Sequence, residues 1–189
     1  MEADWSVEIG QDAPVIDVDW PGFVDLQRDP GLIARIAESA GEPALRNALI
    51  AFNAAASPVF TSKCDMWELE AHELDPDEFG CGLQDACAAG SASWIDVVAR
   101  DQQVFSSLQA HEDWVRKATD RLRREQIPCG RVDLVVRAAV AGGRGGFGIT
   151  LYVAGCGVDT QSAHKARDRV LGAAVAATMK DARASSSIG

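Results

Sequence analysis

Alternation of apolar and polar residues marks the extended segments of this chain. It predicts strands at 62–70, 92–100, 131–141 and 147–155. Proline and glycine punctuate the first 27 residues every few positions, so short extended segments are expected there. Four glycines lie within 142–146, between the last two predicted strands, and favour a hairpin connection.

Apolar residues three and four positions apart predict the helices. We expect helices to begin after Asp29-Pro30, Glu42-Pro43, Ser106-Ser107 and Asp159-Thr160, where a capping residue or a proline precedes a periodic stripe. The last stripe consists mainly of alanine and valine, which lets a helix lie close to the layer it covers. Asp75-Pro76 predicts a further helical turn inside the long connection 71–91.

The order of these elements from Ser62 onward is strand, strand, helix, strand, strand, helix. It predicts a two-layer α+β fold, with an antiparallel sheet of about four or more strands built from a doubled β-β-α unit and both helices on one face. Segment 94–100 also resembles segment 131–137, since both read apolar, Asp, apolar, Val, any residue, Arg. We expect one domain over 1–183, in which an extended and helical segment, 1–60, packs on a core of 62–183. The tail 184–189 is predicted to be flexible.

Two of the predicted strands carry charges at every fourth position. Because residues two apart on a strand share a face, Asp96 and Arg100 should lie beside Asp133 and Arg137, together with Trp94. Three interpretations stay open: the charges pair on a solvated sheet, residues 1–60 cover part of the face, or the face binds a second copy or another protein.

Composition narrows the class of protein. The chain of 189 residues is 47% hydrophobic and 24% charged, as in globular domains. No apolar run could span a bilayer, and the first residues lack the cationic and apolar regions of a signal peptide, so we expect a cytoplasmic protein without a membrane partner.

Charge is unevenly distributed along the chain. The net charge of −10 divides into −15 before residue 100 and +5 from there on. Such an acidic protein repels nucleic acid, which we exclude as a partner. We expect the acidic and basic halves to dock on each other.

Cysteine usage and spacing give no metal signature. Five cysteines without an export signal favour reduced thiols over a disulfide framework. His72, Cys81 and Cys87 lie in one acidic connection, but they lack the closely spaced pairs of a structural zinc site. No metal and no cofactor are therefore expected.

No motif identifies an enzyme. Cys64 or Cys156 could meet His111 in space, although a histidine on the apolar stripe of a helix is more often a core residue. The glycines around Arg144 lead into a strand, whereas phosphate-binding loops lead into a helix, so a hairpin is preferred.

The predicted function is that of a non-catalytic binding module, which binds itself as a homodimer or another protein through Trp94, Asp96, Arg100, Asp133 and Arg137. The alternative is a small enzyme or ligand-binding protein with a pocket between the sheet and the N-terminal helices.

Overall fold

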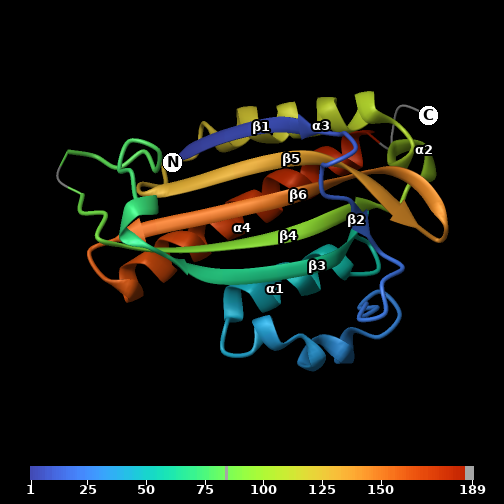
Figure 1. Ribbon diagram of the computed structural model, residues 1–189, viewed down its shortest axis with the longest axis horizontal. Coiled ribbons are helices and arrows are strands. Elements are labelled where there is room, and N and C mark those ends of the chain that lie inside the picture. Colours follow the sequence, from blue (N-terminus) through green and yellow to red (C-terminus); the bar gives the residue numbers. More distant parts are fainter. Residues whose placement is uncertain (84, 186–189) are drawn as a thin grey trace.

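The computed structural model describes residues 1–83 and 85–185, in which one sheet lies in front of a layer of helices (Figure 1). Its strands are β1 Glu2–Glu8, β2 Ile16–Asp17, β3 Val59–Leu69, β4 Ala89–Ala99, β5 Gly130–Ala141 and β6 Arg144–Gly157. Its α-helices are α1 Pro43–Asn53, α2 Gln102–Phe105, α3 Leu108–Leu122 and α4 Thr160–Ser185. Short 3-10 helices are η1 Pro30–Arg35, η2 Ala37–Ser39 and η3 Ala71–Glu73. The α+β class predicted from the sequence is confirmed.

The sheet is mixed. Its strand order is β1-β5-β6-β4-β3, and β2 also pairs with β5. β1 and β2 run parallel to β5, while the other pairs are antiparallel. The prediction of an antiparallel sheet is therefore wrong at this edge. Most of the chain lies between β1 and β5, so no hairpin constrains the direction in which β1 joins. The doubled β-β-α unit stays a prediction.

The main core lies between the sheet and the helices. Ile95 of β4, Leu134 of β5 and Leu151 of β6 are buried against α3 and α4. Gly155 of β6 permits the close approach of α4, because a Cβ there would lie 2.2 Å from the backbone nitrogen of Arg167. The two long helices are joined by the Trp114 indole, which donates to the Thr178 carbonyl at 2.9 Å.

Several local expectations need correction. Asp29 caps a 3-10 helix, η1, instead of an α-helix, and Asp75 begins a turn in which Glu78 N donates to its carbonyl. The hairpin between β5 and β6 turns on Gly142 and Gly143 alone, at φ +57° and +69°. Left-handed φ at both positions matches the twist of the flanking strands, so residues 144–146 extend the pairing. Figure 1 shows the long β5–β6 ribbon that results.

Docking of the acidic and basic halves is confirmed by ion pairs between them. These pairs are Arg123–Asp4, Arg131–Glu78, Arg137–Glu8, His164–Glu68 and Arg167–Glu42. Each joins a base or histidine of the second half to a carboxylate of the first. Uneven charge along the chain thus becomes local pairing in space.

The N-terminal residues do not form a separate layer. β1 adds to the free edge of β5, and the segment around β2 crosses the front of the sheet (Figure 1).

Within the described residues, no helix combines the length and apolar content needed to cross a membrane. Residues 184 and 185 of the predicted tail belong to α4, and 186–189 lie outside the described residues.

Candidate functional site

One face of the sheet, which we call the open face, points away from α3 and α4. Pairing places Asp133, Tyr152, Trp94 and Asp65 opposite one another in a row across β5, β6, β4 and β3. The next row contains Val135, Thr150 and Asp96, and Arg137 follows on β5. The structure therefore brings four of the five predicted site residues onto this face, namely Trp94, Asp96, Asp133 and Arg137.

Arg100 does not join them. β4 ends at Ala99, so the alternation of the strand no longer governs the next side chain. The Arg100 guanidinium donates to the carbonyls of Asn53 and Ala54 at 3.1 Å and to Val59 at 3.0 Å. Carbonyls at the end of a helix lack intrahelical donors, and α1 obtains them from Arg100. The placement of Arg100 on the open face was wrong.

Asp96 is the most buried carboxylate of the open face, with 6% of its surface exposed. Burial raises its pKa to about 6, although a hydrogen bond from Thr150 and the charges of Arg137 and Lys63 oppose the shift. The Thr150 hydroxyl donates to Asp96 Oδ1 at 2.7 Å. Thr150, which the sequence analysis did not single out, is thus the direct partner of Asp96.

The two arginines of β5 are also largely satisfied. Arg131 donates to both oxygens of Asp133, at 2.7 and 3.2 Å, so Asp133 pairs along its own strand. Arg137 donates to Glu8 at 2.9 Å and to the Tyr152 hydroxyl at 3.3 Å. Its guanidinium lies 5.7 Å from the Tyr152 ring centroid. Arg137 Nε is buried without a hydrogen-bond partner among the described residues.

The N-terminal segment covers one end of the open face. Ile16 and Val18 pack with Val98 and Ala139 in a small second core, and the Ser62 hydroxyl donates to the Asp17 carbonyl at 2.7 Å. The expectation that residues 1–60 cover part of this face holds at this end.

Two hollows border the part of the open face that the N-terminal segment leaves uncovered. The first, of about 360 Å³, lies where the N-terminal segment meets β3 and β4, and Trp20, Lys63 and Trp94 line it. The Lys63 amine lies 5.2 Å from the Trp20 ring centroid. The second, of about 270 Å³, lies near the 71–88 connection and includes Trp67 and Tyr152. Aromatic side chains thus extend from one hollow to the other.

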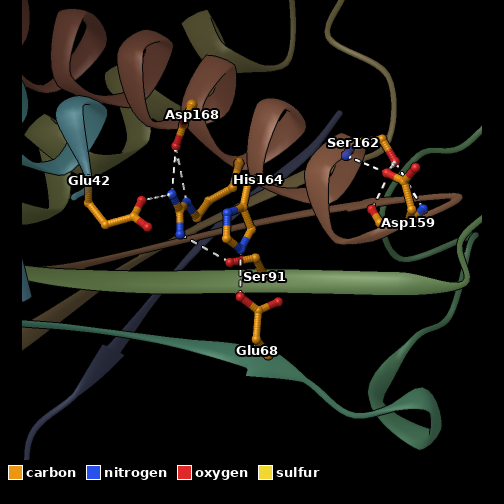
Figure 2. Close-up of polar contacts among 8 residues, drawn as sticks. Glu42, Glu68, Ser91, Asp159, Ser162, His164 and Asp168 are labelled. Carbon is orange, nitrogen blue, oxygen red and sulfur yellow. Dashed lines mark hydrogen bonds and ion pairs between the residues drawn. The ribbon is translucent and has the colours of Figure 1, made fainter.

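A polar cluster on the helix side was missed by sequence reasoning. The Arg167 guanidinium of α4, only 2% exposed, donates to Glu42 at 2.5 Å, Asp168 at 2.8 Å and Ser91 at 3.0 Å. Figure 2 shows these partners converging from the residue before α1, from α4 and from β4, with His164 bonded to Glu68 nearby. The sequence signal that could have revealed it is Arg167 itself, which lies four residues after Ala163 and three before Val170, on the apolar stripe of the last helix. The Arg167 cluster joins α4 to β4 and to the start of α1, and each of its charged side chains has a partner.

The nucleophile considered from the sequence is not assembled. Cys156 forms a disulfide with Cys87, so the expectation of reduced thiols is wrong for this pair. Cys87 lies just before β4 and Cys156 near the end of β6, and these two strand ends are neighbours, since Ala88 N donates to the Gly157 carbonyl. Burial raises the pKa of Cys64 to about 12. His111 is a buried core residue whose ring nitrogen lies 2.9 Å from the Ser107 carbonyl, and burial lowers its pKa.

The glycine turn also has an internal partner. Gly142 N and Gly143 N donate to the two carboxylate oxygens of Asp19, at 3.1 and 2.9 Å. These amides bind a carboxylate of the same chain, which fits the hairpin interpretation.

Comparison of the chain with family models, curated proteins and solved structures found no match.

Proposed function

We propose that this protein is a non-catalytic binding module whose open face associates with a second copy of the chain. The observation that carries the proposal is the band of aromatic residues Trp94, Tyr152 and Trp67, of which Trp67 is 38% exposed. Tryptophan, tyrosine and arginine supply most of the binding energy at protein contacts. A solvated sheet has no comparable use for them.

Charge supports a second copy as the occupant. A two-fold contact places the same patch on both partners, so it must be complementary to itself. The open face carries acidic Asp65 and Asp133 and basic Lys63 and Arg131 within one band. An exclusively acidic or basic patch would favour an oppositely charged partner instead.

The test is the mass in solution, measured by light scattering over a range of concentrations. We expect a dimer for the wild type and a monomer for Trp67→Glu, because a carboxylate would then be buried in the contact. Trp94→Glu should act in the same direction. Ile50→Glu is the matched control, since Ile50 is 44% exposed on α1, in the helix layer. A wild type that is monomeric at every concentration would contradict the proposal.

The second candidate is a small-ligand site in the hollow lined by Trp20, Lys63 and Trp94. Its volume of about 360 Å³ lies in the range of ligand pockets. Two aromatic walls and the Lys63 ammonium group suit a small aromatic carboxylate. A monomeric protein whose tryptophan fluorescence saturates with benzoate, and no longer responds in Lys63→Gln, would favour this function.

A further inference from the structure

Four of the five cysteines gather at one end of the sheet. Cys81 and Cys87 come from the connection before β4, Cys129 from the turn before β5, and Cys156 from the end of β6. The sulfur atoms of Cys81, Cys87 and Cys156 all lie within 4.8 Å of one another. Cys81 Sγ is 3.4 Å from Cys156 Sγ. Cys129 is not a member of that group of three, but it packs in the same buried cluster as the other three cysteines.

The backbone at this end holds the cysteines in place. Cys156 N donates to the Cys129 carbonyl at 3.0 Å, and Gly130 N donates to the Phe79 carbonyl at 2.9 Å. Cys129 has φ +55°, a left-handed conformation that a non-glycine residue adopts at a cost. Phe79, Leu69 and Leu74 pack around the sulfurs. The cluster is therefore built into the sheet end and shielded by apolar side chains.

A disulfide does not account for all four thiols. The Cys87–Cys156 bond uses two sulfurs and leaves Cys81 and Cys129 without covalent partners beside it. Thiolates are preferred ligands of zinc, and a tetrahedral site with bonds of about 2.3 Å separates its sulfurs by about 3.8 Å. For Cys81, Cys87 and Cys156, the 3.4 Å contact and the 4.8 Å limit lie on either side of that separation. Cys129, which packs in the same cluster, is the fourth thiol available.

We propose that Cys81, Cys87, Cys129 and Cys156 bind one zinc ion when the Cys87–Cys156 disulfide is reduced. A dithiol reductant supplies the two electrons and two protons that the disulfide takes up, and is itself oxidised to a disulfide. The four thiols lose their protons to solvent as the ion binds. The ion links Cys81 and Cys87 to the start of β5 and the end of β6, beside the hollow that contains Trp67.

The experiment uses the full chain, supplied with zinc and freed of excess metal. A phosphine takes the place of the dithiol as reductant, and with water it gives the phosphine oxide and two thiols. We expect about one zinc per chain in the wild type and in Cys64→Ser, because Cys64 lies on β3 outside the cluster. Cys81→Ser and Cys129→Ser should each weaken zinc retention at least about tenfold, measured by competition with a chromophoric chelator. Circular dichroism identifies any variant that has not folded.

Cobalt gives a readout on the wild type alone. Substituted Co²⁺ should show the intense charge-transfer absorption of thiolate ligands and the visible bands of a tetrahedral site. Absence of bound zinc in the reduced wild type, or a cobalt spectrum without thiolate bands, would overturn the proposal. A second disulfide, Cys81–Cys129, beside Cys87–Cys156 would also overturn the proposal if the chain retained no metal after both disulfides were reduced.

Discussion

At the scale of single residues, Asp96 is a carboxylate whose burial opposes its charge. Its carboxylate lies under the open face with one direct hydrogen bond, from Thr150. The positive charges of Arg137 and Lys63 act on it without overcoming the cost of desolvation, so its pKa is raised to about 6. A carboxyl whose folded pKa is raised binds a proton more tightly in the folded chain than in the unfolded one.

Replacing Asp96 by asparagine should therefore stabilise the protein at high pH. Between the ordinary pKa of 3.8 and about 6, the folded state keeps a proton that the unfolded state has released, and stability from this group is lost as pH rises. We expect Asp96→Asn to raise the free energy of unfolding by at most about 3 kcal/mol at pH 8 and to show no gain below pH 4.

Urea unfolding of both proteins at the two pH values measures this difference. Asp65→Asn is the control, because Asp65 lies on the same face and is exposed to solvent. An equal gain for both variants, or a gain for Asp96→Asn that does not depend on pH, would contradict the assignment.

At the scale of the elements, Arg167 determines how α4 joins its neighbours. Burial tends to lower its pKa, but its bonds to Asp168 and Glu42 raise it above the ordinary value. Glu42 is the residue before α1, and Ser91 lies on β4, so one guanidinium connects three elements (Figure 2). Removal of one partner of a buried ion pair leaves the other charge without compensation.

We expect Arg167→Met to lower the free energy of unfolding by about 3 kcal/mol, since methionine keeps most of the apolar stem but removes the guanidinium, its charge and its hydrogen bonds. Arg169→Met, at an exposed position of the same helix, should change it by less than about 0.5 kcal/mol. Denaturant unfolding gives both values. Adding Glu42→Gln to Arg167→Met should restore part of the loss; an unchanged loss would mean that packing, not charge, is responsible.

At the scale of the whole molecule, the charge of −10 affects how two copies meet. Internal ion pairs such as Arg131–Glu78 and Arg137–Glu8 neutralise much of the charge difference between the acidic and basic halves of the chain, and they leave a surplus of carboxylates. Two such molecules repel at long range, and salt screens that repulsion. We therefore expect the proposed dimer to have a lower dissociation constant at 0.5 M salt than at 0.05 M salt. Sedimentation equilibrium at the two salt concentrations measures this constant. A higher constant at 0.5 M salt would contradict a contact held mainly by aromatic residues.

What the sequence determined by itself is local. Periodicity placed α1, α3, α4 and the long strands, and Ser107 caps α3 as expected, because capping and amphipathicity depend on residues a few positions apart. Alternation likewise assigned Trp94, Asp96, Asp133 and Arg137 to one face, and it failed for Arg100 at the first residue beyond β4.

Only the tertiary structure decided what distant segments do together. The parallel direction of β1, the crossing of the open face by residues around Ile16, the burial of Arg167 and the gathering of the cysteines all join positions far apart in the chain. No spacing rule reports such contacts, because they depend on which strands become neighbours. For the same reason the cysteines, which lack the close pairs of a zinc motif, are brought together by the pairing of β4, β5 and β6.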